Sequence, residues 1–232
     1  MSNVLDQIVY PGSDQYTAEE LAAPGSKPLD LHELPLARAV DTAYILFEVP
    51  DLDKQEAFLS DFGLVIAEHS PNCLYMRGYG TAPYVYAARK GDRARFLGAG
   101  FLLDSAEDLT HVAQATGLPV EDVDGPGGGQ RVRLTDPDGF LVDLVHGRTR
   151  VEKLDTRREP LPVNLPDTKN RVNRGQRPPL QPSAVERFGH YVLMVTDFQR
   201  SWAWYRKHLG VLPTDVLCTG DGTPALAFTR LD

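Results

Sequence analysis

Cysteine is scarce in this chain, because only Cys73 and Cys218 occur among its 232 residues. The two lie far apart and form no Cys-x-x-Cys pair, which argues against a disulfide scaffold and a cysteine-rich zinc site. No stretch reaches the roughly 18 apolar residues of a membrane-spanning helix, and the segment MSNVLDQIVYPGSDQ lacks the basic and apolar regions of a secretory leader. We therefore expect a cytoplasmic protein in a reducing compartment, without membrane contact.

Positive charge is also in the minority. The chain has 24 Lys and Arg against 32 Asp and Glu, a net charge of −8. This balance argues against nucleic acid as the main partner, since nucleic-acid binding usually needs a basic face. The 42% hydrophobic and 24% charged residues are ordinary for a globular protein. The chain is long enough for one large domain or two small ones.

The N-terminal residues 1–41 show no sustained apolar period. Four prolines interrupt them, at positions 11, 24, 28 and 35. One short helix is predicted from Thr17, because Glu20 stands three residues after this possible N-cap. We expect residues 1–41 to form an arm.

Residues 42–148 contain one pattern twice: a strand, a helix and three further strands. The first copy predicts these elements at 43–49, 50–63, 64–69, 72–80 and 83–90. The second copy predicts them at 95–104, 105–117, 119–124, 130–136 and 139–146. Gly63 and Gly117 are suited to end the two helices, and Ser105 to begin the second. We expect residues 42–148 to form one domain of two such units.

Residues 149–187 differ from what precedes them. Residues 147–187 contain six prolines, at positions 160, 162, 166, 178, 179 and 182. Residues 149–187 carry nine Lys and Arg against five Asp and Glu, within an acidic chain. They are predicted to be an extended linker across an acidic domain surface, with an anion-binding arm as the alternative.

The pattern restarts at residue 188. A strand is predicted at 188–195, a helix at 196–210 and two strands in 214–232. Two copies and the opening of a third predict an α+β fold, in which repeated βαβββ units form a curved mixed sheet around a cavity. We expect 188–232 to be the start of a second, incomplete domain, whose open sheet edge would favour a homo-oligomer.

Three segments carry a family resemblance. The third copy reads Gly189-His190-Tyr191-Val192-Leu193-Met194-Val195-Thr196-Asp197 and then WYRKHLG, while the second copy ends in DPDGFLVDLV. This pattern resembles the vicinal oxygen chelate superfamily, which includes glyoxalase I and the extradiol dioxygenases. Two units, a linker and a further unit are most similar to the type I extradiol ring-cleavage dioxygenases.

This resemblance implies four units in two domains, with Fe(II) in the second domain only. The implied ligands are a His on the first strand of unit three, a His on the first strand of unit four and a Glu on its last strand. Only His190 has a counterpart here, and Val192, two residues on, would line the substrate pocket. Without the signature around it, His190 would be read as an ordinary core histidine.

In the first two copies, the corresponding positions hold Tyr44, Gly98 or Ala99, and Asp143. These side chains cannot form a triad of two His and one carboxylate, so we predict no metal there. The glycine-rich segment GPGGG (125–129) precedes a strand rather than a helix, so it is predicted to be a hairpin loop rather than a phosphate-binding loop.

The resemblance implies an Fe(II)-dependent dioxygenase that cleaves a catechol-like aromatic ring with O2; Mn(II) or another divalent metal is the weaker alternative. A glyoxalase-like isomerase or lyase is the second hypothesis. The third is a non-catalytic protein that binds a small molecule in an apolar cup of the first two units; Tyr44, Tyr75, Tyr84 and Tyr86 either line this cup or pack the sheet. Residues 1–232 alone are expected to be inactive, because only one ligand position is filled.

Overall fold

The structure is a computed structural model that describes residues 34–156, 162–173, 175 and 182–231. The helix predicted from Thr17, and most of the predicted arm, lie outside these residues. The first unit comprises β1 (Ala39–Val49), α2 (Leu52–Phe62), β2 (Val65–His69), β3 (Cys73–Arg77) and β4 (Tyr86–Lys90). The second comprises β5 (Arg95–Leu103), α3 (Ala106–Thr116), β6 (Glu121–Asp122), β7 (Gln130–Thr135) and β8 (Leu141–His146). They are followed by α4 (Phe198–Leu209), β9 (Leu212–Cys218) and β10 (Pro224–Arg230).

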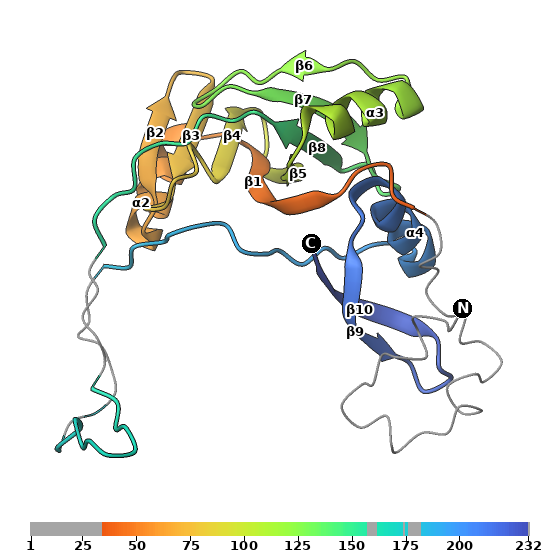
Figure 1. Ribbon diagram of the computed structural model, residues 1–232. Coiled ribbons are helices and arrows are strands. Elements are labelled where there is room, and N and C mark those ends of the chain that lie inside the picture. The colour runs from red at the N-terminus through yellow and green to blue at the C-terminus, as the bar shows by residue number, and fades with distance from the viewer. Residues whose placement is uncertain (1–33, 157–161, 174, 176–181, 232) are drawn as a thin grey trace.

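The two units share one curved sheet of eight strands, called the first sheet below. Its strand order is β2-β3-β4-β1-β5-β8-β7-β6 (Figure 1). β1 pairs in parallel with β4, and β5 in parallel with β8. The antiparallel pair β1–β5 joins the two halves. The predicted βαβββ repeat and mixed sheet are therefore confirmed. β1 starts at Ala39, earlier than predicted, because Ala39 and Asp41 continue the ladder with β5.

Local sequence signals set the helix ends. Asp51 and Ser105 cap α2 and α3, each by accepting a hydrogen bond from the backbone N–H three residues on. Gly63 and Gly117 end these helices in the left-handed conformation. Each helix covers its own half of the sheet with apolar side chains, including Leu59 of α2 and Val112 of α3.

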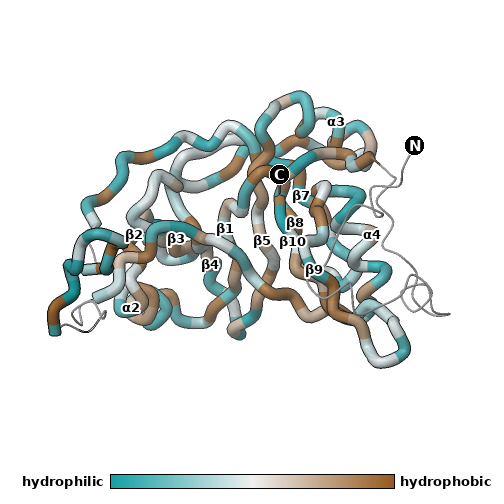
Figure 2. Tube along the Cα trace, turned by 60° about the horizontal axis from the view of Figure 1, so that its bottom comes forward, coloured by the Kyte–Doolittle hydropathy of each residue, from teal (hydrophilic) through white to brown (hydrophobic). Residues whose placement is uncertain are grey.

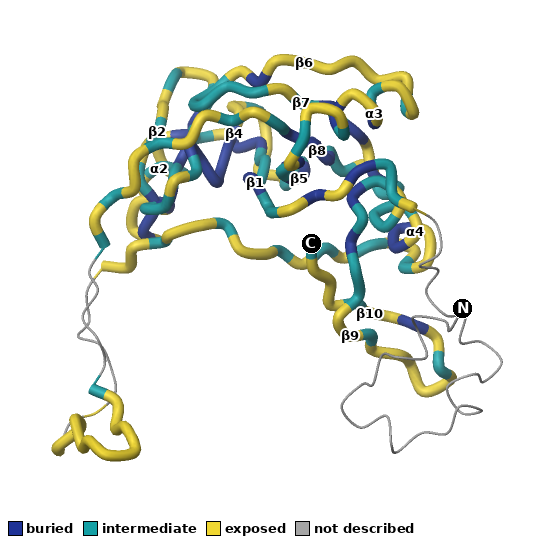
Figure 3. Tube along the Cα trace, in the orientation of Figure 1, coloured by how far each residue is buried: buried dark blue, intermediate teal, exposed yellow. Residues whose placement is uncertain are grey.

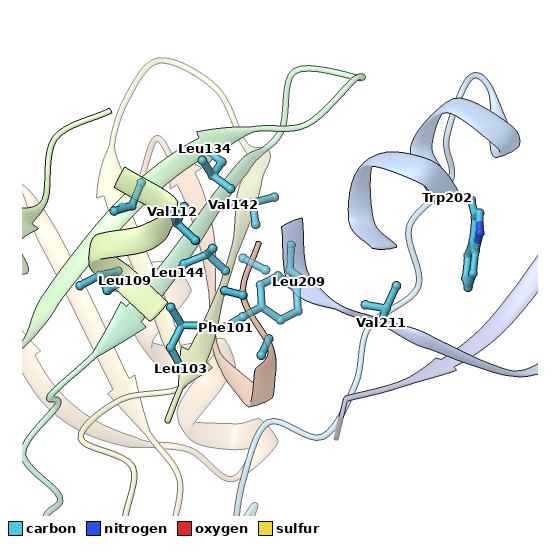
Figure 4. Packing of buried hydrophobic residues seen from close by; sticks show 14 residues of the cluster. Phe101, Leu103, Leu109, Val112, Leu134, Val142, Leu144, Trp202, Leu209 and Val211 are labelled. Atoms are coloured by element: carbon cyan, nitrogen blue, oxygen red, sulfur yellow. The ribbon is translucent and has the colours of Figure 1, made fainter. Parts of the chain in front are cut away.

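The helix α4 packs on the second unit. Trp202, Leu209 and Val211 join Leu109 and Val112 of α3 in one buried cluster (Figure 4). Figure 2 shows hydrophobic positions along the sheet strands, whereas Figure 3 shows that the β9–β10 hairpin is mostly exposed. The helix of the third copy therefore completes the core of the second.

The segment 188–195 was predicted to be a strand, and this prediction is wrong. It is extended but belongs to no ladder of the described residues. The corresponding strand of the first unit, β1, is held between β4 and β5. No described strand lies beside 188–195 in the same way, so its backbone lacks the partners that define a strand.

The ends of the predicted linker lie along the first unit. Leu154 donates to the Tyr79 carbonyl, and Tyr79 donates to the Val185 carbonyl, so residues near both ends of the linker hydrogen-bond to the same short segment. Gly80 allows this approach, since a Cβ there would lie 2.6 Å from the Glu186 carbonyl oxygen. The segment 182–197 then runs from the α2 side of the sheet to α4 (Figure 1).

Candidate metal centre and the aromatic cup

Four residues of the first sheet form a row across the paired strands β1, β5, β8 and β7. Tyr44 pairs with Gly100, Gly100 with Asp143, and Asp143 with Arg133. The residue beside Tyr44 is therefore Gly100, rather than Gly98 or Ala99. The β1–β5 ladder contains register irregularities on both sides of Tyr44, and counting along the sequence cannot detect them.

Hydrogen bonds join the three side chains of this row, those of Tyr44, Asp143 and Arg133. Tyr44 donates to Asp143 Oδ2 at 2.9 Å, and Arg133 donates to both carboxylate oxygens, at 2.7 and 2.8 Å. Tyr44 and Asp143 are both completely buried. Burial, together with the charge of Asp143, raises the pKa of Tyr44 well above its usual range, so the hydroxyl stays protonated and donates.

This donor set does not fit a metal ion. Gly100 supplies no ligand, and a Cβ added there would lie 2.6 Å from the Tyr44 ring. Both oxygens of Asp143 are already engaged, and the bidentate Arg133 neutralises their charge. The residues present build a tyrosine–carboxylate–guanidinium network in place of a metal site.

Aromatic side chains fill the cup on the face opposite the helices. The rings of Tyr44 and Tyr84 lie 4.9 Å apart, as do those of Tyr84 and Tyr75. Tyr86 does not belong to this group, because its ring stacks on Phe47 in the cluster under α2. Of the two alternatives for these tyrosines, Tyr44 and Tyr84 follow the second, because both are buried and pack the sheet.

The predicted metal ligand His190 lies on the segment 188–196, in which exposed and half-buried residues alternate. His190, Val192 and Met194 are exposed, whereas Tyr191, Leu193 and Val195 are half-buried. The Tyr191 ring packs against Phe96 and Phe101 of β5, and its burial raises the pKa of Tyr191 to about 12. The first sheet therefore holds one side of this segment, and His190 and Val192 lie together on the other.

Hydrogen bonds hold this segment at both ends. Thr42 donates to the Phe188 carbonyl at 2.8 Å, and the Thr196 backbone N–H donates to Asp138 Oδ2 at 3.1 Å. Asp138 belongs to the DPDG turn, whose first residue, Asp136, accepts from Tyr205 of α4 at 2.9 Å. The turn therefore positions both the segment that carries His190 and the helix that follows it.

The described residues do not complete a metal site around His190. Within the part of the chain that the structure describes, no group of three His, Cys, Asp or Glu side chains could hold a metal ion. Other histidines have local roles: His146 contacts the Leu103 carbonyl oxygen, and His208 contacts that of Trp204. A single imidazole is a suitable ligand but not a metal site.

A cleft of about 530 Å³ opens where β1 begins and β5 and β8 end. Arg148, half-buried, lies on its wall with its guanidinium carbon 4.1 Å from the centre of the Tyr84 ring. Sequence reasoning missed Arg148. The only local signal is Gly147, which takes φ 76° directly after β8 and turns the chain back over the cup.

No protein-family model matches the chain. The chain is 27% identical over 197 residues to 3-methylcatechol 2,3-dioxygenase of Pseudomonas putida, which covers 77% of this chain and 60% of that enzyme. The homoprotocatechuate 2,3-dioxygenase structure from Brevibacterium fuscum superposes with a TM-score of 0.65 at 21% identity, covering 87% of this chain and 59% of that one. The Arthrobacter globiformis enzyme gives 0.64 at 20% identity, over 89% and 60%.

The topology and these superpositions define the class: the chain has the vicinal oxygen chelate fold. Among proteins of that fold, it is similar to extradiol ring-cleavage dioxygenases. It spans about 60% of the length of the curated relative. Among the described residues, no helix is long and apolar enough to cross a membrane.

Proposed function

We propose that the protein containing this sequence is an extradiol dioxygenase that cleaves a catechol-like aromatic ring with O2. The observation that carries the proposal is the 197-residue similarity to a catechol 2,3-dioxygenase. The fold supports it. Tyr44 and Tyr84 fill the cup of the first sheet and leave no metal site in it among the described residues. This supports placing the chemistry outside that sheet, on the side of the segment 188–196 that carries His190.

His190 is proposed as a ligand of a divalent metal, Fe(II) by the resemblance, and Val192 as a wall of the substrate pocket. Fe(II) held on one face by two His and a carboxylate leaves positions open for a catechol and O2. The described residues supply only the first of these ligands, and their further contribution is positioning. Contacts of Thr42, Tyr191 and Asp138 hold the segment so that the His190 side chain faces away from the first sheet.

The test is oxygen consumption by the natural protein, supplied with Fe(II) and a panel of catechols, with the ring-cleavage product followed by its absorbance. We expect O2 uptake that His190→Ala abolishes. The matched control is His69→Gln, because His69 lies on the edge strand β2 and contacts Glu56. No uptake with any catechol, or undiminished uptake by His190→Ala, would overturn the proposal.

A further inference from the structure

The cleft beside Arg148 has an unusual balance of charge. Arg187 pairs with Asp41 at 3.7 Å and Lys153 with Glu186 at 3.8 Å, so two of its cations have carboxylate partners. Arg148 has no carboxylate partner among the described residues. Among the described residues, its guanidinium donates to two carbonyl oxygens, of Tyr84 at 3.1 Å and Ala43 at 3.5 Å.

Arg148 is also partly screened from water. Its Nε is buried without a hydrogen-bond acceptor among the described residues, and the guanidinium lies over the rings of both Tyr44 and Tyr84. Burial lowers the pKa of Arg148, and only the two tyrosines act in the opposite direction. An arginine remains charged under these conditions, and a buried charge without a counterion is unfavourable.

The rest of the cleft favours an organic ligand over a bare ion. Besides Arg148 and the two ion pairs, its wall combines apolar side chains with two exposed charged residues, Arg150 and Asp104. The apolar residues are Val40, Ala82, Val85, Leu102, Val145 and Phe188. A volume of about 530 Å³ suits a small molecule. A planar guanidinium matches the two oxygens of a carboxylate, and the apolar walls match a hydrocarbon body.

We infer that this cleft binds a small organic carboxylate with an apolar body, and that Arg148 is the counterion of the carboxylate. Arg150 at the mouth would add attraction, while Val85 and Phe188 would cover the body of the ligand. The site contains neither His190 nor the metal proposed for it, so the inference does not depend on the proposed function.

Calorimetry on the natural protein, stripped of metal by a chelator, tests the inference at constant ionic strength. The probes are benzoate, its neutral analogue benzamide and inorganic phosphate. We expect saturable benzoate binding, with benzamide and phosphate each at least about tenfold weaker, as loss of a charge-assisted bond or of the apolar contact predicts. Equal binding of benzoate and benzamide, or tighter binding of phosphate, would overturn the inference.

Variants locate the site. Arg148→Met is expected to weaken benzoate binding about tenfold or more, and Arg150→Gln by a smaller factor. Arg93→Gln is the matched control, since Arg93 is exposed between β4 and β5, at the end of the sheet away from the cleft. If Arg148→Met does not fold, Arg150→Gln and the benzamide comparison still decide. Benzoate affinity that is unchanged in either arginine variant that folds would contradict the assignment.

Discussion

The Tyr44 hydroxyl donates to the Asp143 carboxylate at 2.9 Å, and both residues stand at positions of the repeated unit that correspond to metal-ligand positions of the later units. Arg133 neutralises the carboxylate from the next strand. The network replaces a metal centre by a buried, hydrogen-bonded core of the same sheet. Its energetic role can be separated from catalysis by stability measurements.

Tyr44→Phe should lower the free energy of unfolding by about 2 kcal/mol, because a buried carboxylate loses a hydrogen-bond donor. Urea denaturation measures the change. Tyr86→Phe is the matched control: the Tyr86 hydroxyl is buried without a partner among the described residues, so its removal should be neutral or stabilising. Equal losses in the two variants would show that the Tyr44–Asp143 bond contributes nothing particular.

Gly100→Ala should destabilise the protein by about 1–3 kcal/mol, since the new methyl group would overlap the Tyr44 ring. Gly220→Ala, where a Cβ meets no atom within 4 Å, should change the free energy of unfolding by less than about 0.5 kcal/mol. Thermal denaturation of the two variants compares them directly. A neutral Gly100→Ala would mean that the cup has room beside Tyr44.

Asp138→Ala should release the segment 188–196 from the DPDG turn and loosen the start of α4, because the hydrogen bonds from Thr196 are lost. Hydrogen exchange of peptides covering 188–209 should then become faster. Asp221→Ala is the control, because Asp221 makes similar contacts with Thr219 and Thr223 but lies in the β9–β10 hairpin. Unchanged exchange in Asp138→Ala would show that the turn does not hold the segment.

The same contact predicts a pH dependence. Hydrogen bonds from Thr196 hold the pKa of Asp138 below its usual value of 3.8. A carboxyl group whose pKa is lowered on folding stabilises the folded state above its unfolded pKa, and this contribution is lost as pH falls through the folded value. Protection of 188–209 should therefore decline below about pH 4 in the wild type, with a smaller decline in Asp138→Ala.

Local signals in the sequence predicted the helix ends and the repeat. Gly63 and Gly117 end α2 and α3 and Ser105 begins α3, as predicted, and apolar periodicity reveals the repeated unit. GPGGG indeed lies between β6 and β7. Features that depend on residues far apart in the chain could not be predicted from local sequence signals. The segment 188–195 has the composition of a strand, but a ladder also requires neighbours.

Two site features were hidden for the same reason. Gly100 stands beside Tyr44 because of irregular pairing between β1 and β5, which no spacing rule reports. Arg148 lies outside every predicted element and acquires its surroundings only when Gly147 turns it over Tyr84. Conversely, His190 and Val192 were predicted to share a face by their spacing, and the burial pattern places both on the exposed side.

The proposed function places the metal on the His190 side of the chain and not in the first sheet. The most direct measurement is the metal content of the natural protein after reloading with Fe(II), compared among wild type, His190→Ala and Tyr44→Phe. We predict about one ion per chain in the wild type and in Tyr44→Phe, and its loss in His190→Ala. Retention of metal by His190→Ala together with its loss from Tyr44→Phe would contradict this assignment.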